Sequence, residues 1–169
     1  TPSRLEPDLN GTQTEMTLEV GDKAPDLKLP ATGGKAINLN DYKGRKLVVY
    51  FYPKDNTPGC TQEGRDFRDL YKEFQDAGAD IVGVSKDSLR SHENFIEKFQ
   101  FPFPLIADTE QQLCDAFGVI VEKSMYGKKY IGIDRSTWIF DKKSVLKKSW
   151  RGVKVKGHAE EVLRAVQSL

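Results

Sequence analysis

Cys60 follows a Pro/Gly-rich segment, residues 53–59, and precedes a stretch with helical spacing. The segment itself follows the apolar run 46–52, which is typical of a buried parallel strand. In the stretch after Cys60, apolar residues recur at steps of three and four: Phe67, Leu70, Tyr71, Phe74 and Ala77. The order of strand, loop and helix therefore places Cys60 at the first turn of a helix.

The start of a helix is a setting in which a thiol becomes reactive. The first amide N–H groups lack intrahelical partners and the helix dipole is positive there, and both effects favour an anion. A free thiol with a pKa of ~8.5 is only about 3% thiolate at pH 7, yet the thiolate is the nucleophile. Thr57 can offer a hydroxyl to the molecule that the sulfur attacks. The alternative is a small buried cysteine after a turn, since free cysteines are often buried.

Composition limits the classes of protein to consider. The chain has 169 residues, of which 38% are hydrophobic and 30% charged, and this fits one globular domain with a substantial core. The net charge is +1, so no electrostatic argument favours a nucleic-acid or membrane partner. No apolar run approaches the ~20 residues that cross a bilayer. The sequence indicates neither a metal nor another cofactor.

The N-terminus and the cysteine count bear on processing and compartment. Residues 1–15 are polar and lack the apolar stretch of a secretory signal, so we expect a disordered leader or an expression remnant. Met16 is a plausible native start, and 16–169 is expected to form a single domain. Two cysteines, Cys60 and Cys114, are too few for a disulfide framework. A cytoplasmic setting with reduced thiols is therefore expected.

Strands alternate with helices along the chain. Residues 20–44 alternate apolar and polar side chains around Gly33-Gly34, which predicts a hairpin at a sheet edge. A helix from Cys60 to Ala77, ended by Gly78, is followed by an expected strand at 81–85 and by a helix that is capped by Asp87 or Ser88 and runs to Phe99. We then expect an extended piece ending in 105–107, a short helix capped by Asp108-Thr109 and a long loop over 118–134. Strands at 137–140 and 145–150 precede a last helix from about 159 to 168, whose inward-facing residues are expected to be Val162, Ala165, Val166 and Leu169. This order predicts an α/β domain with a central mixed sheet flanked by helices.

The pattern Pro53-x-x-x-Thr57-x-x-Cys60 resembles that of the peroxiredoxins, thiol peroxidases with a thioredoxin-like fold. Its longer form, Thr57-Pro-Gly-Cys-Thr-x-Glu63 followed by Asp-Phe-Arg-Asp at 66–69, is similar to the bacterioferritin-comigratory or Q-type subfamily. The similarity covers about residues 19–169, because it extends to separate segments at 21–25, 83–85, 103–108, 125–128 and 135–137.

The resemblance implies a role for each residue of the site. Cys60 would be the peroxidatic cysteine, whose thiolate attacks the O–O bond of hydrogen peroxide or an organic hydroperoxide, becomes a sulfenic acid and releases water or an alcohol. Thr57 would hydrogen-bond the peroxide, and Pro53 would shield the sulfur from bulk water. Arg135 matches the arginine that stabilises the thiolate and the charge growing on the oxygens. Glu63 matches a residue that steadies this arginine. Without the resemblance, Arg135 would be interpreted as a surface cation and Thr57 as a turn or cap residue.

The chain departs from the subfamily at the second, resolving cysteine. In similar proteins this cysteine lies five residues after the first or on the following helix, and here Arg65 and Ile96 stand at these positions. The resemblance therefore implies a one-cysteine mechanism in which an external thiol, either glutathione with glutaredoxin or thioredoxin, reduces the sulfenic acid. Cys114 is expected to pack in the core. The resemblance favours a monomer and leaves a dimer open.

Three rival functions use the same residue types. A disulfide oxidoreductase needs a second cysteine close to Cys60, and none is present. A zinc site could draw on Cys60, Cys114, His92 and His158, but the four are scattered singly, without the close pairs of zinc modules. A redox relay that signals through oxidised Cys60 to a binding partner would use the same residues as a peroxidase, so the sequence leaves this alternative open.

Overall fold

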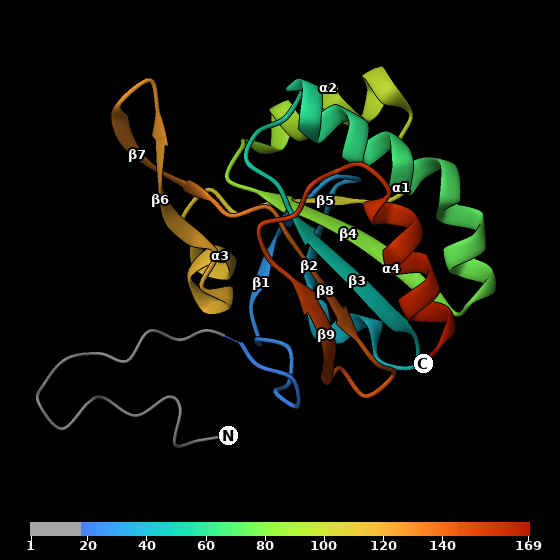
Figure 1. The fold of residues 1–169 in the computed structure, drawn as a ribbon. Coiled ribbons are helices and arrows are strands. Elements are labelled where there is room, and N and C mark those ends of the chain that lie inside the picture. Colours follow the sequence, from blue (N-terminus) through green and yellow to red (C-terminus); the bar gives the residue numbers. More distant parts are fainter. Residues whose placement is uncertain (1–17) are drawn as a thin grey trace, which may run out of the picture.

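The computed structural model describes residues 18–169, so the expected leader at 1–15 and the start at Met16 lie outside the described residues. Seven strands form the central sheet: β1 (Lys28–Ala31), β2 (Lys35–Asn38), β3 (Lys46–Phe51), β4 (Ala79–Ser85), β5 (Leu105–Ala107), β8 (Ser136–Phe140) and β9 (Leu146–Trp150). Their order across the sheet is β2-β1-β5-β4-β3-β8-β9 (Figure 1). Strands β3, β4 and β5 pair in parallel and the remaining pairs are antiparallel. The sheet is mixed, and β1 and β2 form the expected hairpin at one edge.

Helices cover both faces of this sheet: η2 (Leu39–Tyr42, a 3-10 helix), α1 (Pro58–Asp76), α2 (Leu89–Phe99), α3 (Gln112–Phe117) and α4 (His158–Gln167). Helices α1, α2 and α4 pack into one apolar cluster, with α1 and α4 side by side, whereas η2 and α3 pack into the other (Figure 1). Among the residues described, no helix has the length and apolar composition that crossing a bilayer requires.

The side chains of β3 alternate between the two clusters, as the period of a strand demands. Val48 and Tyr50 join the cluster under α1, which also contains Cys60. Val49 and Phe51 join the opposite cluster, which contains Cys114. The two cysteines therefore lie on opposite faces of the central sheet.

The ends of two helices refine the sequence expectations. Helix α1 begins at Pro58, two residues before Cys60, since proline suits the first helical position. It ends at Asp76 with Ala77 as its C-cap, and Gly78 follows with a φ of +81°, a conformation that glycine adopts without strain. In α2 the cap is Ser88, whose hydroxyl accepts the N–H of Ser91 at 3.1 Å. Asp87 is not the cap.

Two other helices differ from expectation in detail. Helix α3 has Gln111 at its N-cap, although Asp108 still accepts the N–H of Cys114 at 2.8 Å. In α4, Leu163 is buried, whereas Leu169 lies beyond the last turn and is exposed, so the expectation for Leu169 was wrong.

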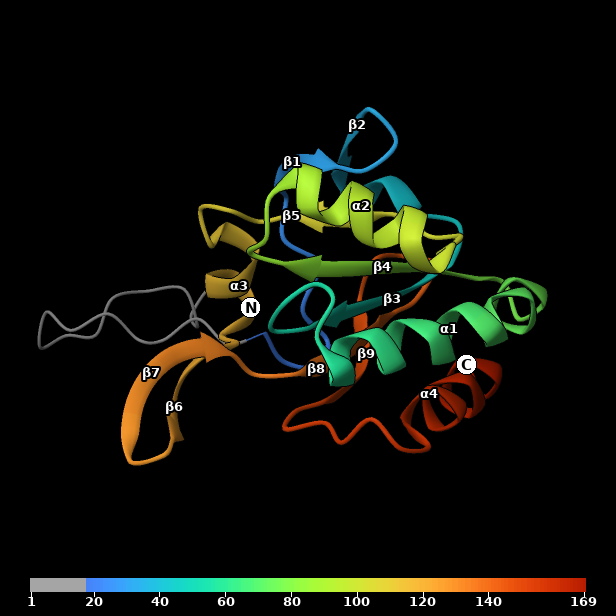
Figure 2. The same ribbon diagram turned by 90° about the horizontal axis from the view of Figure 1, so that it is seen from above.

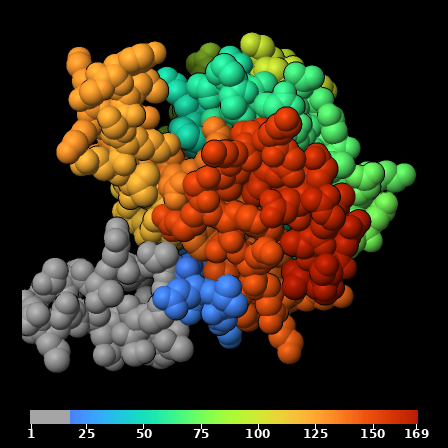
Figure 3. All heavy atoms as spheres, in the orientation of Figure 1, coloured from blue at the N-terminus to red at the C-terminus, as the bar shows by residue number. Residues whose placement is uncertain are grey.

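The long loop expected over 118–134 was wrong, because the chain there forms an antiparallel hairpin of β6 (Ile120–Met125) and β7 (Lys128–Ile133). Tyr126 and Gly127 close it with positive φ angles of 52° and 77°, which fit the tight turn of a hairpin. The hairpin stands away from the central sheet (Figures 2 and 3). Because both of its faces reach solvent along much of their length, its sequence lacks the alternation by which strands are recognised.

Candidate active site

The pairing of β3 with β8 brings Arg135 close to Cys60. Phe51, the last residue of β3, lies opposite Ser136, the first residue of β8. Arg135 immediately precedes Ser136, so it lies at the same end of these two strands as the loop that leads from β3 into α1. Its carbonyl oxygen accepts the N–H of Val153 at 3.0 Å, which fixes the backbone there. Two segments distant in sequence thus meet at one point.

Cys60 lies in the first turn of α1 and is only 2% exposed. The N-cap of this helix is Thr57, but its side chain makes no capping hydrogen bond. Instead, the Thr57 hydroxyl donates to the carbonyl oxygen of Lys54 at 2.8 Å. The first-turn N–H groups are therefore left without a side-chain cap, and they favour an anion at the sulfur. The Thr57 oxygen keeps lone pairs that can accept a hydrogen bond from a bound molecule.

The guanidinium of Arg135 joins the sulfur to a buried carboxylate. Nη2 donates to Cys60 Sγ at 3.3 Å, and Nη1 donates to Glu63 Oε1 at 2.7 Å. The Arg135 side chain is 17% exposed and that of Glu63 only 1%. A planar guanidinium held at two nitrogens has little freedom to rotate, so its charge is fixed beside the sulfur.

Burial and charge alter the ionisation of both partners. Burial raises the pKa of Glu63 to about 7, although Arg135 acts in the opposite direction. Burial also opposes the charge on Arg135, but Glu63 and Cys60 together raise the pKa of the guanidinium above its ordinary value. Arg135 therefore stays cationic, while Glu63 exchanges its proton near neutral pH.

Gly59 makes room for this arrangement. A Cβ atom at position 59 would lie 3.2 Å from Nη2 of Arg135, a separation tighter than most real contacts of a Cβ. Because the guanidinium is already held by Glu63 and Cys60, it has little room to withdraw. A glycine before the cysteine thus permits the close approach of the cation, a role that the sequence pattern did not reveal.

The structure brings together some of the expected site residues more closely than others. Arg135 contacts both Cys60 and Glu63 directly, and Thr57 lies one turn before the sulfur at the helix start. Pro53 is half-buried just after β3. Its proposed shielding of the sulfur stays a prediction.

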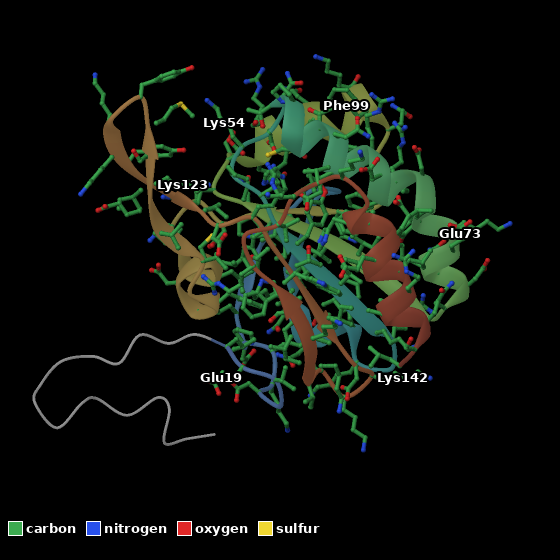
Figure 4. The ribbon with its side chains drawn as sticks, viewed as in Figure 1. Glu19, Lys54, Glu73, Phe99, Lys123 and Lys142 are labelled. Carbon is green, nitrogen blue, oxygen red and sulfur yellow. The ribbon has the colours of Figure 1, made fainter. Side chains whose placement is uncertain are left out.

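The hairpin contributes a second cation that sequence reasoning missed. Lys123, part-way along β6 and opposite Tyr130 of β7, is half-buried (Figure 4). Burial and then the charge of Arg135 lower its pKa, while Asp134 and Cys60 act in the opposite direction. A positive charge close to Arg135 makes the surroundings of the sulfur more favourable to an anion.

Cys114 is placed far less favourably for chemistry. It is fully buried, with Leu113 and Phe117 in the cluster on the opposite face of the sheet. Burial, and then the nearby Asp108, raise the pKa of its thiol well above the ordinary value. Cys114 thus remains a protonated core residue, as expected.

The four side chains of the rival zinc reading do not meet. Among the described residues, the one group of potential ligands consists of Asp55, Asp87 and His92, which includes neither cysteine. Its oxygens are already engaged: Oδ2 of Asp55 accepts from Ser91 and His92, and Oδ2 of Asp87 accepts from the Ser85 hydroxyl and the Asp55 N–H. We therefore interpret this group as a hydrogen-bond network. His158 is the first residue of α4.

Comparisons with known proteins point to one family. A model described as the AhpC/TSA family matches residues 20–149. The chain is 49% identical to Peroxiredoxin Bcp of Bacillus subtilis over 154 residues, which cover 91% of this chain and 98% of the relative. It is 50% identical to Peroxiredoxin Bcp of Xanthomonas campestris over 155 residues, which cover 92% of this chain and 97% of the relative.

Solved structures agree. The structure of Xanthomonas campestris Peroxiredoxin Q superposes with a TM-score of 0.83 at 50% identity, covering 92% of this chain and 98% of the other. Another structure, of the Xanthomonas campestris bacterioferritin comigratory protein, was described for its alkyl peroxide reduction activity, and it has a TM-score of 0.83 at 48% identity over 89% of this chain and 98% of the other. The thioredoxin-like fold expected from the sequence is thereby confirmed.

Proposed function

Because the chain belongs to the AhpC/TSA family, and within it to the peroxiredoxins of the Bcp or Q type, it is a thiol-dependent peroxidase, and we propose that Cys60 is the residue that attacks the peroxide. One observation supports this most directly: Arg135 Nη2 lies 3.3 Å from Cys60 Sγ at a helix start that carries no side-chain cap. An anion on the sulfur is thus favoured from two sides, by the helix and by the guanidinium.

The proposed chemical step transfers one oxygen atom to the sulfur. The Cys60 thiolate attacks the terminal oxygen of the hydroperoxide, an S–O bond forms as the O–O bond breaks, and the sulfur is oxidised by two electrons to the sulfenic acid. The departing hydroxide or alkoxide takes up a proton and leaves as water or an alcohol. Thr57 accepts the peroxide O–H, and Arg135 stabilises the charge on the departing oxygen. Pro53 keeps bulk water from the sulfur, and Glu63 keeps Arg135 oriented.

An external thiol completes the cycle. One thiol condenses with the sulfenic acid to form a mixed disulfide and water, and a second thiol reduces this disulfide to regenerate Cys60. The burial of Cys114 on the other face of the sheet supports this one-cysteine route. Glutathione with glutaredoxin, or thioredoxin, are the proposed reductants, and a reducing cytoplasm is the proposed compartment. The cations Arg135 and Lys123 would suit an anionic thiol such as glutathione.

Matched substitutions at the two cysteines test the proposal. Cys60→Ser should abolish consumption of hydrogen peroxide and of an alkyl hydroperoxide, because an alcohol is not a thiolate. Cys114→Ser is the control, and it should keep the rate constant within a few fold, since its side chain only fills the core. Trapping of the oxidised protein with dimedone should label Cys60 alone. Full activity of Cys60→Ser would exclude the proposed role.

The redox relay is not favoured, since the similar proteins are named as peroxiredoxins and one is described for alkyl peroxide reduction. A turnover assay decides between the two. With excess peroxide and glutathione plus glutaredoxin, or thioredoxin plus its reductase, the enzyme should consume many equivalents of peroxide. Arrest after one equivalent with every reductant would support the relay.

A further inference from the structure

A buried polar network lies beneath the loop that joins β3 to α1. At its centre is Asp55, only 7% exposed, whose carboxylate accepts three hydrogen bonds. Tyr52 Oη donates to Oδ1 at 2.6 Å, and Ser91 Oγ and His92 Nδ1 donate to Oδ2 at 2.8 and 2.7 Å. The N–H of Asp55 donates to Asp87 Oδ2 at 2.8 Å. Both the side chain and the backbone of this loop residue are thus anchored.

His92 is fully buried, and each of its ring nitrogens faces an acceptor. Nδ1 lies 2.7 Å from the Asp55 carboxylate, and Nε2 lies 2.9 Å from the carbonyl oxygen of Ile106. Both ring nitrogens are thus engaged, and the ring is held between the loop and β5. Removal of either Asp55 or His92 leaves the other buried polar group without its hydrogen-bond partner.

The hydrogen bonds of Asp55 to Ser91 and His92 tie the loop before Cys60 to α2. Next to Asp55, Asn56 adopts a left-handed conformation with a φ of 58°, which is uncommon for a residue other than glycine. Thr57 and the first turn of α1 follow directly. The direction in which the chain enters α1 thus depends on where Asp55 is held. Arg135, which also donates to Glu63, contacts the sulfur directly and not through this loop.

We propose that the hydrogen-bonded pair Asp55–His92 positions Thr57 and the first turn of α1 for the reaction of Cys60 with peroxide. The inference rests on the function proposed above for Cys60. Neither Asp55 nor His92 touches the peroxide, so both are positioning residues that act through the loop. Their effect is nevertheless large, because a displacement of ~1 Å in a reacting group costs on the order of 10²-fold in rate.

Two reactions of the same sulfur separate positioning from general stability. Reaction with peroxide needs Thr57 and the first-turn N–H groups in place, whereas alkylation by iodoacetamide needs only a thiolate that can be reached. In Asp55→Asn and His92→Asn, the rate constant with hydrogen peroxide should fall about 10- to 100-fold. The rate of alkylation should fall by less than about threefold, or rise, because Arg135 still contacts the sulfur.

Asp108→Asn is the matched control. Asp108 is also buried, but its carboxylate accepts the backbone N–H of Cys114, a residue of the cluster on the opposite face of the sheet. This variant should lose stability and keep both rate constants. The double variant Asp55→Asn/His92→Asn should be no slower than the slower single one, since a pair that acts as a unit is lost only once.

Each outcome has a definite meaning. Wild-type peroxide reactivity in Asp55→Asn or His92→Asn overturns the inference, and so does an equal fall in the peroxide and alkylation rates. Circular dichroism identifies a variant that does not fold. Tyr52→Phe, which removes one hydrogen-bond donor from Asp55, is then measured in its place, and it should show the same selective fall in the peroxide rate constant, but a smaller one. If wild-type Cys60 itself reacts with peroxide no faster than free cysteine, the proposed function fails first, whatever the variants do.

Discussion

The guanidinium of Arg135 is divided between two partners, the sulfur of Cys60 and the carboxyl group of Glu63. A lysine could reach one of them but could not present two fixed donors at once. The orientation of these N–H donors matters because the charge on the departing oxygen exists only as the O–O bond breaks. Arg135 therefore contributes oriented hydrogen-bond donors as well as a positive charge.

We predict that Arg135→Lys lowers the rate constant of Cys60 with hydrogen peroxide about 100-fold, the usual effect of losing one oriented donor. Because a cation remains near the sulfur, the rate of alkylation by iodoacetamide should fall much less. Stopped-flow measurements of both reactions at one pH provide the comparison. Equal peroxide rates for the variant and the wild type would contradict the importance of the bidentate contact.

At this scale, the sequence showed part of the site. The pattern around Cys60 predicted a thiol at a helix start, and the resemblance added Arg135 and Glu63, which the structure places in contact. The pair Asp55–His92 escaped notice, because alone the first resembles a turn residue and the second a helix histidine. The signal that was present is a polar His92 on the apolar inner face of its helix.

At the scale of elements, the strands and helices of the main sheet could be predicted, but their register could not. The proximity of Arg135 to Cys60 depends on Phe51 lying opposite Ser136, and local propensity carries no information about pairing between distant strands. The hairpin over 120–133 was missed for a different reason. It packs little of its surface into a core, so no hydrophobic pattern marks it.

A further prediction concerns α2. Ile96, at one position expected for a resolving cysteine, is half-buried against the apolar cluster that contains Cys60. We predict that peroxide consumes two thiols in Ile96→Cys, through a disulfide between positions 60 and 96, but only one in the wild type. Ile96→Ser is the control. Thiol counts by mass spectrometry under non-reducing conditions provide the measurement, and equal losses in all three proteins would contradict the prediction.

For the molecule as a whole, two buried groups make stability depend on pH in opposite directions. Burial raises the pKa of Glu63 from 4.5 to about 7 and lowers the pKa of His158 from 6.5 to about 4. Between about pH 4.5 and 7 the folded chain holds a proton on Glu63 that the unfolded chain has lost, so stability falls as pH rises. Between about pH 4 and 6.5 the unfolded chain holds a proton that folded His158 lacks, so stability rises with pH.

We predict that single substitutions expose these opposed effects. Relative to the wild type, the free energy of unfolding of Glu63→Gln should rise by about 3 kcal/mol between pH 4.5 and 7. The reason is that a glutamine cannot hold the proton that Glu63 keeps in the folded chain and loses on unfolding. His158→Gln should show the opposite trend, of similar size, between pH 4 and 6.5. Urea unfolding at a series of pH values measures both. Curves parallel to that of the wild type would contradict the assignment.

The missing side-chain cap at Thr57 lowers the stability of the fold, and a selection for more stable variants would reveal this. A carboxylate there would cap α1 and strengthen the fold by about 1 kcal/mol, so selection for heat resistance alone would favour Thr57→Asp. The same carboxylate would compete with the sulfur for the amide groups and repel its negative charge. Such variants would be more stable and inactive toward peroxide, so the activity of this protein depends on a helix start that is not optimised for stability.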